Sequence, residues 1–496
     1  MVVVVMTIKP DLDPNSEVPI YRQLYGYFSD LIANGRLGRG EKLPATRELA
    51  GLLGLNRATI SAAYELLEAE GLISGHVGRG SFVTGGRSRG GIDWTALLVR
   101  TEPAPVMPAI AMGERGISFA TSRPSAQLFP LDAFRASCDE VMSGPEFASV
   151  LQLGSPSGYE PLRRYLLDEA RRQGVAGRED DLLITSGCQQ ALDLITRVLL
   201  QPGDRAVLED PVYPGLRNLV AGAGAHLIGV PVGNEGMDVD HLARVLAREQ
   251  PALLVVTSNF QNPTGATLSA EGRRVLLRSV RESGVVVVEN DIYGELRYYG
   301  EALPSLKQLE GGEDVILLRS FSKLTFPGLR VGWVIGPRPL ISRLAQAKQL
   351  ADLHSDQFSQ AVLLRFAETG HLEAHRQRVL AAGTERLSAV LAGCERHLPP
   401  GTAFTRPQGG MNLWVKLPEP LDAGDLLPRA LRENVAYLPG RYFTVSRPEP
   451  RALRLSFAGL TPEEIREGLS ILGRIFSSEL KSTRAADERV PASAVV

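Results

Sequence analysis

The stretch SFSKLTFPGLRVGWVIG, Ser320–Gly336, is the most informative part of this chain. An apolar run, DVILLRS at 314–320, leads into it, and a second apolar run, RVGWVIG at 330–336, closes it. Lys323 lies between the two runs and Arg330 begins the second. The stretch therefore places one amine and one guanidinium at a fixed spacing between two expected strands, and the neighbouring sequence indicates what kind of sheet they belong to.

Short apolar runs alternate with amphipathic helical stretches from about residue 116 onward. This alternation is typical of strands joined by crossover helices, and so of a mostly parallel sheet with helices on both faces. Only about ten residues separate the two runs around Lys323, fewer than the dozen or more that a parallel crossover needs, so the last strand is expected to run antiparallel. The earlier runs are LLIT (182–185), RAVLED (205–210), HLIGVPV (226–232), ALLVVTS (252–258) and GVVVVEN (284–290).

Composition excludes several classes of protein. With 44% hydrophobic and 22% charged residues over 496 positions, the chain is ordinary globular material with room for two or three domains. The net charge of −2 gives no global field toward nucleic acid or membrane, so any DNA contact must be local. No run approaches the ~18 apolar residues of a membrane span, and MVVVVM lacks signal-peptide features, so a cytoplasmic protein is expected.

Cysteine and histidine usage gives no metal site. Cys138, Cys188 and Cys394 are far apart and show no CxxC spacing, which argues against a disulfide framework or a zinc site and suits a reducing cytosol. The histidines are scattered along the chain. Cys188 is expected to be a small buried filler rather than a nucleophile, because no histidine lies near it in a recognisable catalytic arrangement.

The amino-terminal part has a different hydrophobic pattern from the alternating runs after residue 116. In TRELAGLLGLNRATISAAYELLEAEGLI, two apolar stripes at helical spacing flank the turn Gly54–Asn56, which is helix-turn-helix spacing. Two short β-prone runs around Gly78–Gly80 follow and suit a wing. The expected organisation is a helix-turn-helix domain at 14–84, a Gly-, Arg- and Pro-rich linker at 85–115, an α/β domain at 116–480 and a disordered tail at 481–496.

The segments LPATRELA, RATI and GRGSFV make the head similar to the GntR family of winged helix-turn-helix regulators. Arg57 and Thr59 fall at the start of the expected second helix, where side chains reach base edges. Arg47 and Arg79 are placed for phosphate or groove contact. Arg47 could instead pair with Glu48 or Glu65, which would make it a packing residue. Double-stranded DNA is the expected partner of this domain.

Five segments at strand ends resemble, in this order, the fold-type I pyridoxal-phosphate-dependent aminotransferases: SGCQQALDLI, EDPVYPG, NFQNPTG, ENDIYGELRY and SFSKLTFPGLRVGW. The resemblance implies pyridoxal 5'-phosphate as cofactor. It implies covalent attachment to the catalytic Lys323, phosphate binding by Arg330 with Ser320 near it, and a helix start at Ser186, Gly187 and Cys188 that also holds the phosphate. Tyr213 would stack on the ring, Asn262 and Tyr293 would bind its phenolic oxygen, and Arg454 would pair with a ligand carboxylate.

A winged helix joined by a linker to an aminotransferase-like domain resembles the MocR subgroup of GntR regulators. The implied fold is an N-terminal winged helix-turn-helix plus a fold-type I α/β domain, with a mostly parallel seven-stranded sheet and a small C-terminal α/β subdomain. The resemblance further implies a head-to-tail homodimer and a small amino-group effector.

Three positions depart from the aminotransferase pattern. The acid that pairs with the ring nitrogen is replaced by Asn290, although a local shift could bring Asp291 to that place. Leu153 stands where a tyrosine reaches across the dimer, and Ser122 stands where a glycine is usual. Cofactor anchoring is therefore expected to be intact, while carbanion chemistry is expected to be weakened.

The sequence favours a dimeric DNA-binding regulator that carries pyridoxal phosphate and responds to an amino-group ligand. Two alternatives stay open. One is a working aminotransferase with an accessory DNA-binding head, and the other is a regulator that senses pyridoxal phosphate itself.

Overall fold

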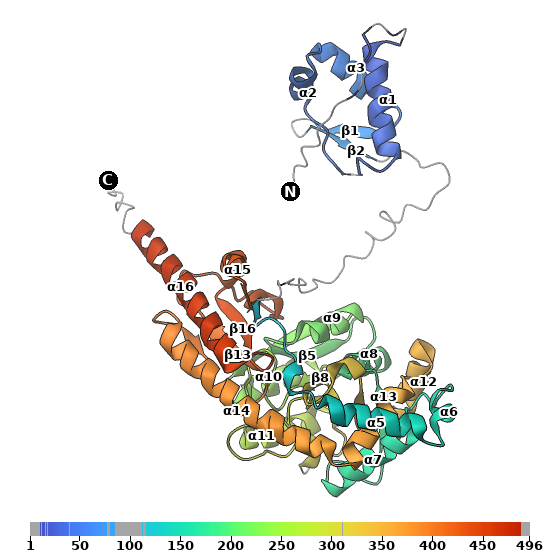
Figure 1. Ribbon diagram of the computed structural model, residues 1–496, viewed down its shortest axis with the longest axis vertical. Coiled ribbons are helices and arrows are strands. Elements are labelled where there is room, and N and C mark those ends of the chain that lie inside the picture. The colour runs from blue at the N-terminus through green and yellow to red at the C-terminus, as the bar shows by residue number, and fades with distance from the viewer. Residues whose placement is uncertain are drawn as a thin grey trace. The chain divides into compact units, whose positions relative to one another are not determined.

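The computed structural model describes residues 10, 12–14, 16, 18–38, 40–76, 80–84, 112, 116–309 and 311–487. The chain divides into two compact units, Met1–Pro103 and Ala104–Val496, and each is described by itself (Figure 1). The predicted linker 85–115 lies outside the described residues apart from Met112.

The amino-terminal unit is built on three helices and a short hairpin. Gly54 ends the second helix with φ 65°, a left-handed conformation that glycine adopts without strain. Asn56 caps the third helix by accepting a hydrogen bond from the N–H of Ala58 at 3.0 Å. The elements are α1 (Ile20–Ala33), α2 (Thr46–Leu53), α3 (Arg57–Ala69), β1 (Ile73–His76) and β2 (Gly80–Val83).

A single apolar core holds the amino-terminal unit together. Leu49 of α2 and Ile60 of α3 are fully buried, as the two stripes in the sequence predict. The Tyr64 hydroxyl donates to the carbonyl oxygen of Pro44 at 2.9 Å, which fixes α3 to the chain before α2. Strands β1 and β2 pair antiparallel, from Ile73 opposite Val83 to His76 opposite Gly80. The unit is therefore a helix-turn-helix followed by a β-hairpin.

The larger unit is organised around an eight-stranded sheet of order β4-β11-β10-β9-β8-β5-β6-β7. Its inner strands pair in parallel, whereas β11 runs antiparallel to both of its neighbours, as the short connection before it predicts. The seven predicted strands are all present, and the two-residue β7 adds one edge. The strands are β4 (Asp180–Thr185), β5 (Arg205–Asp210), β6 (His226–Gly233), β7 (Gly236–Met237), β8 (Leu253–Val256), β9 (Val286–Asn290), β10 (Ile316–Ser320) and β11 (Gly332–Pro337).

Helices cover both faces of this sheet, because successive strand residues point to opposite sides. Leu183, Leu208 and Val288 pack with the helices of one face, and their neighbours Leu182, Val207 and Val287 pack with those of the other. The first face carries α8 (Cys188–Leu199), α9 (Pro214–Gly222) and α12 (Arg338–Asp352), and the second carries α7 (Glu160–Arg172), α10 (Val239–Glu249), α11 (Ala270–Ser283) and α13 (Gln357–Glu368).

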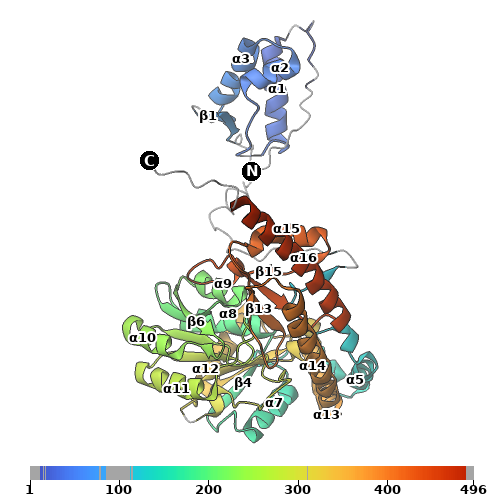
Figure 2. The ribbon, with the colours of Figure 1, turned by 90° about the vertical axis from the view of Figure 1, so that its left-hand side faces the viewer.

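A smaller subdomain contains a four-stranded antiparallel sheet of order β12-β13-β16-β15 and the parallel pair β14-β3. Helices α14 and α16 lie side by side along it (Figures 1 and 2). Its elements are β3 (Ile117–Ser118), α14 (His371–His397), β12 (Ala403–Phe404), β13 (Asn412–Lys416), α15 (Ala423–Arg432), β14 (Val435–Ala436), β15 (Leu438–Pro439), β16 (Ala452–Ser456) and α16 (Pro462–Asp487).

Helix α16 reaches further along the chain than the sequence predicts. Helix α16 continues to Asp487, so the predicted disorder from residue 481 is wrong as far as that residue, and 488–496 lie outside the described residues. Among the described residues, no helix combines the length and apolarity needed to cross a bilayer. The remaining helical elements of the larger unit are η1 (Ala126–Leu128), α5 (Leu131–Ser143), α6 (Phe147–Val150), η2 (Leu306–Gln308), η3 (Phe321–Lys323), η4 (Pro327–Leu329) and η5 (Gly440–Tyr442).

Candidate functional site

A cavity of about 660 Å³ opens in the larger unit, at the carboxyl ends of the parallel strands. Parallel α/β sheets place ligands at this edge. The cavity is lined from both subdomains, because β10 and α8 contribute from the large sheet and β15 and β16 from the small one. The predicted site residues on its wall are Cys188, Tyr213, Asn262, Asn290, Tyr293, Ser320, Lys323, Arg330 and Arg454.

Lys323 projects into this cavity from η3, the single turn that follows β10. Its Nζ donates to the carbonyl oxygen of Ser122 at 3.0 Å and lies 5.6 Å from the centre of the Tyr293 ring. The Ser320 side chain caps this turn by accepting from the N–H of Ser322 at 3.0 Å, which fixes where the lysine emerges. The amine therefore has a defined position beside an aromatic ring.

Arg330 is a second cation on the cavity wall. Its backbone adopts φ 55°, which turns the chain between η4 and β11. Its Nη2 donates to the carbonyl oxygen of Ser186 at 3.3 Å, and a Cβ on Gly187 would lie only 2.4 Å from the same nitrogen. Ser186 and Gly187 thus contact Arg330 although they are not on the cavity wall. The N-terminal end of α8, where a helix has free N–H groups, and this guanidinium therefore bring positive charge together, an arrangement that suits an anion.

Tyr213 supplies an aromatic wall just before α9. A Cβ on Gly215 would lie 2.4 Å from the tyrosine ring, so only glycine at that position lets the ring lie where it does. Burial raises the pKa of Tyr213, and its hydroxyl is therefore protonated at neutral pH. The ring is placed to stack on a flat group in the cavity.

Arg454, contributed by β16, is a buried cation on the cavity wall. Its Nη1 donates to Asn262 Oδ1 at 3.0 Å and its Nη2 donates to the carbonyl oxygen of Ala120. Its Nε is buried and has no hydrogen-bond partner among the described residues. Burial lowers the pKa of Arg454 to about 10, so it remains charged at neutral pH. A buried guanidinium with a spare donor is suited to an anionic group of a ligand.

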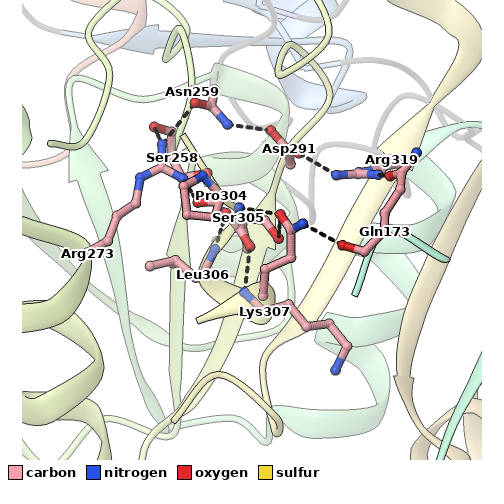
Figure 3. A network of polar contacts seen from close by, with 12 residues as sticks. Gln173, Ser258, Asn259, Arg273, Asp291, Pro304, Ser305, Leu306, Lys307 and Arg319 are labelled. Carbon is pink, nitrogen blue, oxygen red and sulfur yellow. Dashed lines mark hydrogen bonds and ion pairs between the residues drawn. The ribbon is translucent and has the colours of Figure 1, made fainter. Parts of the chain in front are cut away.

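Asn290 and Asp291 lie at the end of β9 and point to opposite faces of the sheet. Asn290 lines the cavity, and its Oδ1 is buried without a hydrogen-bond partner among the described residues. Asp291 accepts from Asn259 Nδ2 at 2.8 Å and pairs with Arg319 Nη2 at 3.3 Å (Figure 3). The structure therefore does not bring Asp291 to the cavity, because strand alternation and two partners hold its carboxylate elsewhere.

Most residues of the network that holds Asp291 are buried, and Figure 3 shows how they contact one another. Arg273 of α11 is fully buried and donates to Asn259 Oδ1 at 2.9 Å. Glu289 lies on the same side of β9 as Asp291 and accepts from the N–H of Leu306 at 2.9 Å. Burial, followed by the nearby Asp291, raises the pKa of Glu289. The network stabilises the far side of the strand and leaves Asn290 alone on the cavity side.

Several wall residues were not predicted from the sequence, and Cys188 is half-buried on the cavity wall, not fully buried as a filler would be. Desolvation raises the pKa of the Cys188 thiol to about 12, so the thiol stays protonated at neutral pH and is a poor nucleophile. Thr257 and Ser322 follow strand ends, a position that could have indicated them. The other wall residues with polar groups that were not predicted as site residues are Thr121, Ser122, Arg123 and Gln189, of which Ser122 is one of the three departures from the aminotransferase pattern.

The head presents two of its predicted contact residues to solvent. Arg57, the first residue of α3, and Arg47 of α2 are exposed, while Thr59 is half-buried. No ion pair joins either arginine to a carboxylate in the described part of the chain, so the pairing of Arg47 with Glu48 or Glu65 is not seen. Arg79 lies outside the described residues.

Comparison with known families and proteins fits this arrangement. The family described as "Aminotransferase class I and II" matches residues 143–472, and "Bacterial regulatory proteins, gntR family" matches residues 20–83. A 2-aminoadipate transaminase of Thermus thermophilus is 41% identical over 363 residues, covering 72% of this chain and 89% of the relative.

A second relative spans both parts of the chain. The HTH-type transcriptional regulator TauR of Rhodobacter capsulatus is 30% identical over 483 residues, covering 93% of this chain and 98% of the relative. Among solved structures, the α-aminoadipate aminotransferase LysN of Thermus thermophilus, complexed with N-(5'-phosphopyridoxyl)-L-leucine, is similar with TM-score 0.70 and 38% identity. That likeness covers 74% of this chain and 94% of LysN. The chain therefore belongs to the class I and II aminotransferase family and, with its gntR head, to the MocR subgroup of GntR-type transcriptional regulators.

Proposed function

We propose that this chain is a transcriptional regulator that carries pyridoxal phosphate on Lys323 and changes its DNA binding when an amino-group ligand enters the same cavity. The observation that carries the proposal is the cavity wall. It combines an intact set of anchoring groups with an amide, Asn290, where a catalytic carboxylate would stand. When bound, pyridoxal phosphate supplies an electron sink for charge released at the ligand's Cα.

The residues present fit this cofactor. Arg330 and the start of α8 form an anion site at one end, and the amine of Lys323 lies on the same wall. Tyr213 offers a flat aromatic face in the same cavity. Asn290 Oδ1 and Arg454 Nε are buried polar atoms without partners in the described chain, and a polar ligand would satisfy both.

Each anchoring group has its own part in binding. Arg330 would hold the phosphate, Asn262 and Tyr293 would bind the phenolic oxygen, and Lys323 would hold the aldehyde carbon covalently. Arg454 would bind the carboxylate of an incoming amino acid, whose amine competes with Lys323 for the same carbon. The ligand could then shift an equilibrium between two arrangements of the chain, provided that it binds one of them more tightly.

A second candidate function is a working aminotransferase, favoured by the 41% identity to a 2-aminoadipate transaminase. Asn290 weighs against it, because an amide cannot hold a proton on the ring nitrogen as a carboxylate does. Asp291 does not repair the loss, since Asn259 and Arg319 occupy both of its oxygens. We therefore propose ligand binding as the main activity and slow turnover at most.

A homodimer is part of the proposal. Leu151 and Leu153 are 66% and 78% exposed, and Leu350 and Leu353 are 92% and 59% exposed. Gln357 Nε2 donates to the carbonyl oxygen of Gln152 at 2.8 Å, which holds the first pair of leucines against the start of α13. Exposed leucines on neighbouring segments suit a surface that a second copy covers. A head-to-tail arrangement of the two copies remains a proposal from the family resemblance.

DNA recognition by the head gives a direct test. Arg57→Ala is expected to weaken binding to a specific duplex by about 1–3 kcal/mol, because an arginine at the start of a recognition helix can bind a guanine edge. The dimer predicts two half-sites whose centres are whole helical turns of about 10–10.5 base pairs apart. Duplexes that the chain selects from a random pool show the spacing of the half-sites. Fluorescence anisotropy on a selected duplex then measures the loss of affinity in Arg57→Ala.

The control is Arg36→Ala, which removes an exposed arginine that lies after α1 and outside α3. We expect this variant to keep the ratio of specific to non-specific affinity. If Arg57→Ala weakens selected and random duplexes equally, Arg57 contacts phosphate and does not read a base.

A further inference from the structure

The cavity wall carries more positively charged side chains than the proposed cofactor and an amino acid with a neutral side chain would bind. Four cations line the wall, Arg123, Lys323, Arg330 and Arg454, and none of the described wall residues is an aspartate or a glutamate. In the proposed function Arg330 binds the phosphate, Lys323 is attached to the aldehyde carbon, and Arg454 binds the ligand's α-carboxylate. Arg123 is left without a counter-charge.

Arg123 has no partner elsewhere in the described chain. No ion pair or side-chain hydrogen bond joins its guanidinium to another described residue, although the side chain is exposed and could reach out. Its main chain, by contrast, is fixed. A Cβ on Gly459 would lie 3.2 Å from its carbonyl oxygen, and its N–H donates to the carbonyl oxygen of Thr121 at 3.2 Å.

The segment that carries Arg123 forms one side of the site. Ala120 accepts from Arg454 Nη2, and Ser122 accepts from Lys323 Nζ at 3.0 Å. The guanidinium of Arg123 therefore leaves the main chain from the same short segment that contacts both the carboxylate-binding arginine and the cofactor-binding lysine. A ligand held between those two groups has its side chain within the same cavity as Arg123.

Part of the cavity wall is apolar, as the methylene groups of a ligand's side chain require. Leu192, Leu216 and Leu438 line it, and no described acidic side chain competes for the cation. An arginine on the same wall as these apolar side chains is suited to a carboxylate at the end of a short aliphatic chain.

We infer that Arg123 selects an amino-acid ligand with a second anionic group on its side chain, a dicarboxylic amino acid such as glutamate or 2-aminoadipate. This rests on the proposed function of the same cavity. Arg454 binds the α-carboxylate and Arg123 binds the ω-carboxylate, so Arg123 is a specificity-determining residue. The isosteric amide glutamine fits the same space but carries no second charge.

The test compares matched ligands on the cofactor-loaded full-length protein. Titration of the bound cofactor's absorbance with aspartate, glutamate and 2-aminoadipate, and with asparagine and glutamine, gives a dissociation constant for each. We expect the preferred diacid to bind about ten- to a hundred-fold more tightly than its amide or than other neutral amino acids, since a charge-assisted pair in a partly closed site has that strength. Homocysteate, an ω-sulfonate, distinguishes a carboxylate-specific contact from a general anion contact.

Three variants assign the preference to one residue. Arg123→Leu should bring the affinity for glutamate down to that for glutamine, and Arg123→Lys should keep part of the preference because the charge remains. Arg135→Leu, which removes an exposed arginine of α5 that is paired with Asp132, should keep all of it. A preference that survives Arg123→Leu would overturn the inference.

The titration also separates the role of Arg123 from the proposed function of the cavity. If neutral and acidic amino acids bind equally well to the unmodified protein, the assignment of Arg123 is wrong while the proposed function stands. If no amino acid alters the bound cofactor's spectrum, the proposed function fails and the inference fails with it.

Discussion

Lys323→Ala is expected to abolish the absorbance band near the edge of the visible spectrum that pyridoxal phosphate acquires on covalent attachment to the protein. The reason is positional. Lys323 is the one lysine on the wall of the described cavity, and its Nζ lies beside the Tyr293 ring within the site. The phosphate contacts through Arg330 would remain, so weak non-covalent binding can persist without the band.

Borohydride reduction followed by peptide mapping identifies the attached lysine without relying on any activity. The mass of the cofactor should appear on the peptide that contains Lys323. The matched control is Lys416→Ala, since Lys416 pairs with Glu449 at 3.2 Å and is not among the cavity residues. Circular dichroism checks that the Lys323 variant is folded. An unchanged band in a folded Lys323→Ala protein would exclude Lys323 as the attachment site.

Asn290→Asp is expected to raise the rate of the half-reaction that converts the bound cofactor to pyridoxamine phosphate by at least about ten-fold. A carboxylate at this position would hold a proton on the ring nitrogen, and each pKa unit of such stabilisation corresponds to about 1.4 kcal/mol. Asn290 lies on the cavity wall with its Oδ1 unsatisfied, so the substitution changes charge without changing shape. Single-turnover spectroscopy with excess amino acid measures the rate.

Asp291→Asn is the companion variant. It removes the charge that pairs with Arg319 on the other side of the strand, and should alter stability more than the rate. Rapid turnover by the unmodified protein that Asn290→Asp does not change, but that Asp291→Asn abolishes, would give Asp291 the role at the ring. The chain would then be a working aminotransferase.

Much of the fold could be predicted because it depends on local pattern. RAVLED at 205–210 forms β5 with those bounds, and the short connection after 314–320 indicates the antiparallel β11. Helix caps such as Asn56 fix element ends from a single side chain. Patterns of this kind do not require knowledge of distant contacts.

The candidate site was predictable only in part, because two of its features depend on geometry between distant segments. Asn290 and Asp291 are adjacent, and only the observed register of β9 tells which of them meets the cavity. Arg123 follows a segment of little regular structure, and nothing near it in the sequence indicates that Ser122 contacts Lys323, which lies 201 positions away. Long-range placement of this kind comes from packing of the two subdomains.

The account's central claim is that an amino-group ligand, entering the cavity that already holds pyridoxal phosphate, controls DNA binding. A titration of the selected duplex with full-length protein, alone, with pyridoxal phosphate and with pyridoxal phosphate plus an amino acid, tests it most directly. We expect the amino acid to change the dissociation constant for DNA by about five- to 150-fold in the unmodified protein and not in Lys323→Ala, with little product formed. A DNA affinity that no amino acid alters, or that pyridoxal phosphate alone changes in full, would contradict the claim.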